Sequence, residues 1–176
     1  MSLGAPMADG SARIEPLRED HREALRAVCA EDDEIWEIYP TRFFGTEFDA
    51  AFDKCFGDPR SIAFALYDGD ALVGMSAFLG IDEPNKALEI GRTYLAPRLR
   101  GSGFNRRIKR LMLDRAFACG FTRVEFRIDT RNTRSMAAVE KLGARREGVL
   151  RANRITWTGH VRDTALYAIL AEEWRR

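Results

Sequence analysis

The segment around residues 87–118 constrains the fold most, because three local patterns follow one another there. The strand-like stretch ALEIGRTYLAP ends at Pro97, and RLRGSGFNRR follows, with Gly101 and Gly103 set among arginines. An amphipathic helix comes next and ends before Gly120. Its apolar stripe is Ile108, Leu111, Met112 and Ala116, while Arg106, Arg107, Lys109, Arg110, Asp114 and Arg115 occupy its other faces. A strand, a glycine turn and a helix in this order point free backbone N–H groups at a bound anion.

Two familiar phosphate loops do not fit this turn. A dinucleotide fingerprint needs a third glycine where Arg106 stands, and a nucleotide-triphosphate loop needs Gly-Lys-Ser/Thr. A purely structural turn stays open on the pattern alone.

The rest of the chain alternates strands and helices. We expect a strand at 13–17, a helix at 19–30, and short helices between 31 and 56, broken at Pro40 and Gly45. A hairpin follows around 68–70, then a half-buried strand, TRVEFRIDT, and a helix capped by Asn132. Two antiparallel strands around 158–160 complete a single α/β (α+β) domain over 11–176, a mixed twisted sheet flanked by helices. Residues 1–10 carry no periodicity and are interpreted as disordered or as a cloning remnant.

Composition narrows the setting. The 176 residues contain no apolar run of the roughly 20 residues that a membrane span requires, and no signal-peptide pattern, so we expect a cytoplasmic protein. The three cysteines lack metal-ligand spacing, and no metal site is expected. Residues 1–90 hold 8 Lys/Arg against 19 Asp/Glu, a balance of −11, whereas residues 91–176 hold 20 against 8, a balance of +12. One surface therefore suits an anion and another a cation.

The motifs resemble one known family. Arg98-x-x-Gly101-x-Gly103 is similar to the R/Q-x-x-G-x-G/A signature of the GNAT acetyltransferase superfamily. RNTRSMAAVEKLGARREGVLR and VRDTALYAILAEEW resemble the Rim-type branch, whose better-known members acetylate protein N-termini. The match is close over residues 86–176 and holds only in element order over 11–85.

The resemblance implies acetyl-CoA as co-substrate and a primary amine as acceptor. The pyrophosphate is expected on the amides from Arg100 to Asn105, and the pantetheine arm along Thr93 to Leu95, where an N–H of Tyr94 or Leu95 can polarise the thioester carbonyl. The full set of predicted cofactor-binding residues is Thr93, Tyr94, Leu95, Arg98, Arg100, Gly101, Ser102, Gly103, Phe104, Asn105 and Asn132. A basic C-terminal half suits the phosphates.

Three residues are predicted to carry the chemistry. Asn132 and Ser135 lie i, i+3 at a helix start and match the Rim-type asparagine and serine. Many GNAT enzymes have a tyrosine acid where Val139 stands, so Ser135 is the candidate that assists the leaving sulfur. Glu89 is the candidate base, directly or through water. Capping by Asn132 and a solvated Glu89 remain the structural alternatives.

The acceptor site is expected in AEDDEIWEIYP, where Glu34 attracts a cationic amine and Trp36 and Tyr39 stack on it. A solvated helix start is the alternative reading of this run. A peptide or protein N-terminus is the preferred acceptor, and a polyamine or an amine-bearing antibiotic is the alternative. A non-catalytic acyl-CoA-binding protein and a homodimer stay open. A nucleic-acid partner is disfavoured by the net charge of +1.

Overall fold

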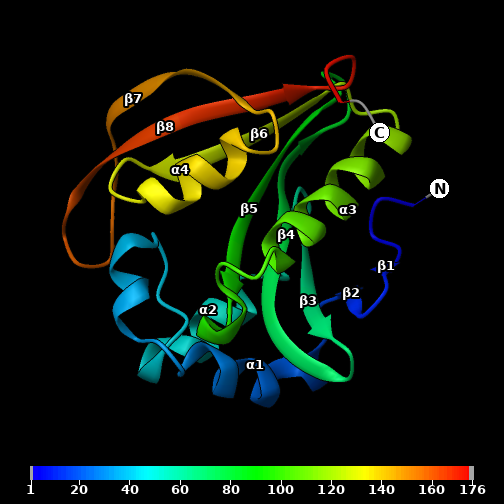
Figure 1. Ribbon diagram of the computed structural model, residues 1–176. Helices are drawn as coiled ribbons and strands as arrows, with labels where there is room; N and C mark the ends of the chain where they lie inside the picture. Colours follow the sequence, from blue (N-terminus) through cyan, green and yellow to red (C-terminus); the bar gives the residue numbers. More distant parts are fainter. Residues whose placement is uncertain (1, 175–176) are drawn as a thin grey trace.

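The computed structural model describes residues 2–174. Among these residues, one eight-stranded sheet runs in the order β1-β2-β3-β4-β5-β6-β8-β7 (Figure 1). Its strands are β1 (Met7–Asp9), β2 (Ala12–Pro16), β3 (Ile62–Asp68), β4 (Ala71–Asp82), β5 (Ala87–Leu95), β6 (Arg123–Asp129), β7 (Arg145–Ile155) and β8 (Val161–Leu170). β5 and β6 pair in parallel, and every other neighbouring pair in this sheet is antiparallel. The predicted mixed sheet is therefore confirmed.

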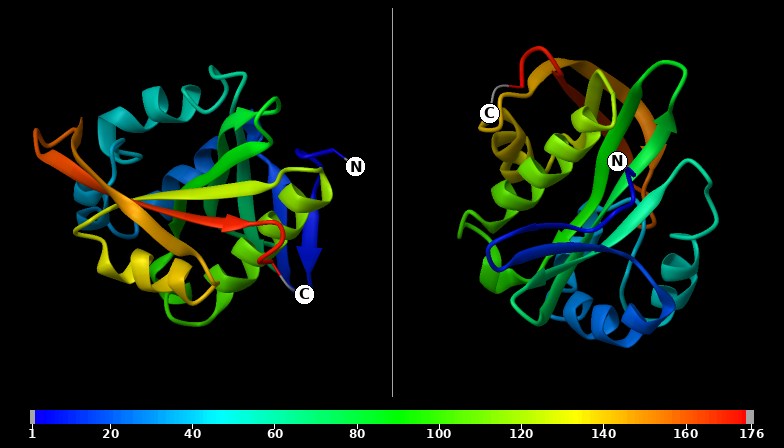
Figure 2. Two further views of the ribbon diagram at one scale, coloured as in Figure 1. Left: turned by 90° about the horizontal axis from the view of Figure 1, so that it is seen from above. Right: turned by 90° about the vertical axis from the view of Figure 1, so that its right-hand side faces the viewer.

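Helices cover both faces of the sheet (Figure 2). The α-helices are α1 (Arg22–Cys29), α2 (Phe48–Asp53), α3 (Phe104–Ala118) and α4 (Thr133–Glu140), and short 3-10 helices lie at Glu19–His21, Glu34–Ile38, Gly45–Glu47 and Pro97–Leu99. Apolar residues of α3 and α4 form one core cluster with one face of the sheet. Residues of α1, α2 and the Glu34–Ile38 helix form a second cluster on the other face. Among the described residues, no helix is long and apolar enough to cross a membrane.

The parallel pair at the centre of the sheet is short. Residues 87–89 of β5 pair with 123–125 of β6, and beyond Glu89 the two strands diverge (Figure 1). A register shift between β4 and β5 accompanies the divergence, and Arg92 there has a φ of 50°, in the left-handed region that non-glycine residues rarely adopt. The bulge leaves Glu89 and Thr93 on opposite faces of one strand, because Thr93 meets α3 while Glu89 lies on the face opposite Leu88 and Ile90. A gap with access to both faces results.

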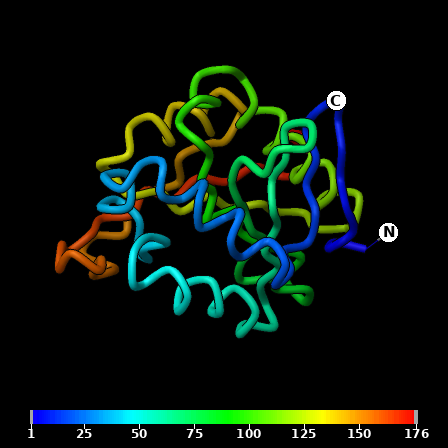
Figure 3. Tube along the Cα trace, turned by 90° about the horizontal axis from the view of Figure 1, so that it is seen from below, coloured from blue at the N-terminus to red at the C-terminus, as the bar shows by residue number. Residues whose placement is uncertain are grey.

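The chain between α1 and α2 lies beside the tip of the β7–β8 hairpin, as Figure 3 shows from below. The indole N–H of Trp157, in the hairpin turn, donates to the carbonyl of Trp36 at 2.7 Å. The guanidinium of Arg42 lies 4.8 Å from the ring of Trp157. These contacts join the hairpin turn to the chain between α1 and α2.

The predicted elements are found at their expected places, with one correction at the N-terminus. Residues 1–10 were expected to lie outside the fold, but Met7–Asp9 pair with β2 and Met7 is buried in the core. A strand of three residues is too short to show a periodicity. It pairs with β2 across a tight turn in which Gly10 has a φ of 57°. Residue 1 lies outside the described residues.

Candidate active site

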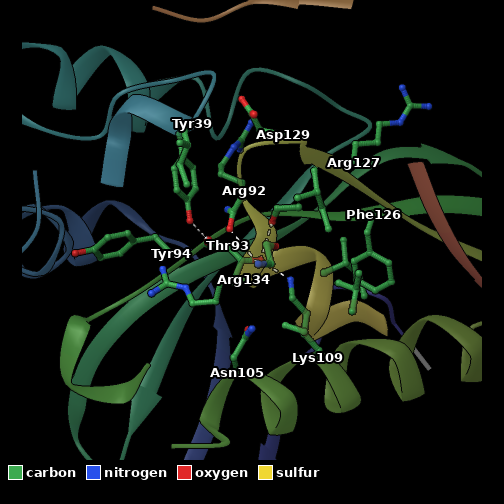
Figure 4. Close-up of a pocket in the computed structure, with 18 of the residues that line it drawn as sticks. Tyr39, Arg92, Thr93, Tyr94, Asn105, Lys109, Phe126, Arg127, Asp129 and Arg134 are labelled. Atoms are coloured by element: carbon green, nitrogen blue, oxygen red, sulfur yellow. Dashed lines mark hydrogen bonds between the residues drawn. The ribbon is translucent and has the colours of Figure 1, made fainter. Parts of the chain in front are cut away.

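A cleft of about 740 Å³ opens where β5 and β6 diverge. Its walls come from β5, β6, α3, α4 and the segment from residue 35 to 43, and Figure 4 shows side chains from these elements converging on it. Because the sheet is open at this point, the cleft reaches from the face that carries α3 and α4 to the opposite face.

The glycine turn forms one end of the cleft. Gly101 and Gly103 have φ values of 81° and 86°, which only glycine adopts without strain. Among the described residues, the amides of Gly101, Gly103, Asn105 and Arg106 have no hydrogen-bond acceptor. They gather at the N-terminus of the 15-residue helix α3, so the turn presents free donors and the positive end of a helix dipole to the cleft.

Most of the predicted cofactor-binding residues surround this end. Those that line the cleft are Thr93, Tyr94, Leu95, Arg100, Gly101, Gly103, Asn105 and Asn132. Three do not: Arg98 is exposed, Ser102 hydrogen bonds within the turn, and Phe104 is buried in the core. The Oδ1 atom of Asn105 is buried without a hydrogen-bond partner in the described structure. It is therefore an acceptor available to a ligand.

Arg100 braces the turn with both its backbone and its side chain. Its amide donates to the carbonyl of Pro97 at 3.1 Å. Its guanidinium forms an ion pair with Asp32 and donates to the carbonyl of Leu95 at 3.2 Å. The amide of Arg100, which the sequence placed among the pyrophosphate donors, is thus already used, because a turn needs its own internal hydrogen bonds.

The edge of β5 that faces β6 is unpaired beyond Glu89. The carbonyl of Thr93 accepts a hydrogen bond from the hydroxyl of Tyr39 at 2.5 Å. A carbonyl has two lone pairs, so this contact leaves room for a second donor. The side chain of Tyr94 points the other way, and its hydroxyl donates to the carbonyl of Val28 at 2.9 Å. Tyr94 therefore contributes only its backbone to the cleft edge.

Asn132 and Ser135 lie together at the start of α4, and both line the cleft. The Oδ1 atom of Asn132 accepts the backbone N–H of Ser135 at 3.0 Å, which makes Asn132 the N-cap of the helix. The Ser135 hydroxyl has no hydrogen-bond partner among the described residues and is free to meet a ligand. Capping and a role in the cleft are thus compatible for this pair.

Glu89 also lines the cleft, on the strand end where pairing with β6 stops. Burial raises the pKa of its carboxyl above the usual value, and Arg127, whose Nε lies 3.8 Å from Oε2, acts in the opposite direction. A carboxylate held in this way can accept a proton more readily than a solvated one.

Lys109 is the residue that sequence reasoning missed. It was placed on a polar face of α3, but it is 5% exposed and lines the cleft. Its ammonium donates to the hydroxyl of Thr93 and lies 5.8 Å from the ring of Phe126 (Figure 4). Burial lowers the pKa of Lys109 to about 7, and Glu89 partly opposes that change. Leu113 and Ala116, four and seven residues after Lys109, are also buried. This helical spacing places Lys109 on the same face as two apolar residues, and it is the sequence signal that could have predicted its burial.

The three predicted acceptor residues are not brought together. Tyr39 lines the cleft, whereas Glu34 is exposed outside it. Trp36 is fully buried, stacks on Tyr94 with ring centroids 4.7 Å apart, and donates its indole N–H to the carbonyl of Cys29 at 3.1 Å. Its assignment to the acceptor site is therefore wrong, because the apolar face of a short 3-10 helix packs it into the core.

The comparisons with known proteins agree with this geometry. The family model described as the acetyltransferase (GNAT) domain matches residues 12–145. A probable GNAT-family acetyltransferase from Chromobacterium violaceum ATCC 12472 has a TM-score of 0.91 at 28% identity, over 97% of this chain and 88% of the other. A GCN5-related N-acetyltransferase from Brucella melitensis has a TM-score of 0.87 at 27% identity, over 97% and 80%.

A more distant structure shares the fold alone. Mycobacterium smegmatis RimJ, solved with CoA-disulfide, has a TM-score of 0.82 at 22% identity, over 98% of this chain and 88% of the other. No curated protein matches the sequence.

Proposed function

Since this chain belongs to the GNAT acetyltransferase family and uses acetyl-CoA, we propose that it transfers the acetyl group to a primary amine by direct attack in a ternary complex. One observation carries the proposal: a single cleft joins the free amides of the glycine turn to the unpaired edge of β5. The turn suits the phosphates of a coenzyme, and the edge suits an extended arm that carries amide groups.

We assign the cofactor contacts to residues that have free groups in the cleft. The amides of Gly101, Gly103, Asn105 and Arg106 bind the pyrophosphate, and the edge from Thr93 to Leu95 binds the pantetheine arm. A backbone N–H at this edge polarises the thioester carbonyl, because a fixed donor stabilises the charge that develops on the oxygen.

The proton steps are assigned to two side chains. Glu89 accepts a proton from the attacking amine, directly or through water, as the new N–C bond forms. The hydroxyl of Ser135 donates a hydrogen bond to the sulfur as the C–S bond breaks. Lys109 lies against Thr93 on the cofactor side of the cleft and, when protonated, adds positive charge there.

The Rim-type motif supports a peptide or protein N-terminus as acceptor. Asn132 and Ser135, which match the asparagine and serine of that motif, both line the cleft. Purified protein incubated with acetyl-CoA and a panel of peptides and small amines tests the proposal, with released thiol and acetylated product both measured. Stoichiometric thiol and product are expected. Binding of acetyl-CoA without product from any amine would indicate a non-catalytic binding protein instead.

A further inference from the structure

The cleft has a second half on the face of the sheet opposite α3 and α4. Along β6, Val124, Phe126 and Ile128 pack into the core on the α3 side. Because side chains alternate along a strand, Arg127 and Asp129 project to the other face. Arg162 on β8 lines the same half, and Arg154 on β7 is its register partner. An acceptor that approaches opposite the coenzyme meets these side chains.

Arginines outnumber the available carboxylates in this half. Arg92, Arg127, Arg154 and Arg162 all line the cleft. The carboxylates beside them already pair with arginines. Arg127 lies near both Glu89 and Glu125, and Nε of Arg162 lies 3.9 Å from Oδ2 of Asp129. Asp129 is bound by Arg131, with Nη2 to Oδ2 at 2.8 Å. Glu125 is bound by Arg123 at 2.9 Å and by Arg127 at 3.1 Å.

Two of the arginines have no carboxylate partner among the described residues. The side chain of Arg154 makes no ion pair or hydrogen bond with the described residues. It is nevertheless close enough to Glu89 to lower the pKa of that carboxyl. The Nη1 atom of Arg92 is buried without a hydrogen-bond partner. Buried donors are normally satisfied, so the Nη1 atom of Arg92 indicates an acceptor that the ligand supplies. Arg154 is exposed and lines the cleft, so its guanidinium is free to bind a ligand there.

The acidic run AEDDEIWEIYP does not offset the excess of arginines over carboxylates in this half of the cleft. Asp32 forms an ion pair with Arg100, and Glu34 and Glu37 are exposed and do not line the cleft. The expected attraction of a cationic amine by this run therefore has no basis at the cleft itself.

We propose that the acceptor is a primary amine that also carries an anionic group, a carboxylate or a phosphate, which Arg154 binds while the amine faces Glu89. The inference rests on the proposed function and names its substrate class. Guanidinium groups form strong, charge-assisted hydrogen bonds with such anions. A second ammonium group at the same place is repelled, which disfavours polyamines. Peptide N-termini meet the requirement when an acidic residue lies at or beside the first position.

Four-carbon amines of matched length test the proposal. At the far end, 4-aminobutyrate carries an anionic carboxylate, 1-aminobutane a neutral methyl group and 1,4-diaminobutane a cationic ammonium group. 3-Aminopropylphosphonate distinguishes a phosphate-like anion from a carboxylate. For each amine, kcat/KM with acetyl-CoA and binding to the CoA-loaded protein are measured. We expect at least about tenfold preference for an anionic amine over 1-aminobutane, with the diamine last. Equal binding, preference for the diamine, or no binding of either anionic amine would overturn the proposal.

Variants locate the effect. Arg154→Gln should lower kcat/KM for the preferred anionic amine about tenfold more than kcat/KM for 1-aminobutane. Arg151→Gln is the matched control, because Arg151 is exposed on the same strand and outside the cleft lining. An unchanged preference in Arg154→Gln would contradict the assignment. If anionic amines bind selectively and no amine is acetylated, the proposed function fails while the inference stands.

Discussion

Lys109 on α3 donates a hydrogen bond to the hydroxyl of Thr93 on β5, and so ties the helix that follows the glycine turn to the strand edge. The Thr93 hydroxyl also lies 2.8 Å from that of Ser76. Because Lys109 is buried, its charged form loses hydration in the folded protein, and this loss disfavours the ammonium. Because Lys109 also lines the cleft, it is a first target for substitution.

Lys109→Met should stabilise the protein near neutral pH. With its pKa lowered to about 7, the folded chain binds fewer protons than the unfolded chain between pH 7 and the ordinary lysine value. The destabilisation due to Lys109 is therefore complete below pH 7 and decreases as the pH rises through this window. We expect the variant to exceed the wild type by about 1–3 kcal/mol in free energy of unfolding near pH 6, and by less near pH 10.

Urea unfolding at several pH values measures this difference. Lys54→Met is the control, because Lys54 is exposed and its substitution should leave the pH dependence unchanged. A Lys109→Met variant with the same pH profile as the wild type would show that the ammonium is solvated in the folded protein.

Glu89→Gln should remove the acid limb of the pH profile of kcat/KM. Burial raises the pKa of Glu89, and a general base must be ionised, so activity should fall as the pH decreases through that raised pKa. The substitution should lower kcat by about 100-fold or more. Glu83→Gln is the control, because Glu83 is exposed and outside the cleft lining. Wild-type kcat in Glu89→Gln would assign the proton to a water relay that does not use this carboxylate.

Ser135→Ala and Asn132→Ala should have separable effects. Removal of the free Ser135 hydroxyl should slow turnover about tenfold and change the Kd of acetyl-CoA less than about twofold. Asn132→Ala removes the cap of α4 and should lower the free energy of unfolding by about 1 kcal/mol, whereas Asn132→Asp should retain the cap. Thermal unfolding and steady-state kinetics on the three variants check this. Full turnover in Ser135→Ala would remove the hydroxyl from the mechanism.

The strongly patterned parts of the fold were predictable from the sequence. The apolar stripe of α3 and the glycine turn before it are local features, and the turn between β7 and β8 is marked by its own residues. The divergence of β5 from β6 was not predictable in this way. It depends on a register shift and on the unusual backbone of Arg92, neither of which leaves a periodic signal.

Which residues line the cleft was predictable where a sequence motif marks them, and was less predictable where only tertiary burial decides their position. Gly101, Gly103, Asn132 and Ser135 all line one cleft, as their motifs implied. Lys109 was predicted to lie on a polar face of its helix but lines the cleft, whereas Trp36 was predicted to line the acceptor site but is buried in the core. A lysine is usually exposed, and an aromatic residue within an acidic run is easily assigned to a binding site. Tertiary packing overrides both tendencies: α3 turns Lys109 inward, and Tyr94 covers Trp36.

Calorimetric titration of acetyl-CoA into Gly103→Trp and Gly120→Trp tests the central assignment most directly. The two glycines have φ values of 86° and 88° and open surroundings, so a side chain is equally strained at either position, but only Gly103 lines the cleft. We predict that Gly120→Trp binds acetyl-CoA like the wild type and that Gly103→Trp binds at least about 100-fold more weakly. Wild-type affinity in Gly103→Trp would contradict the account.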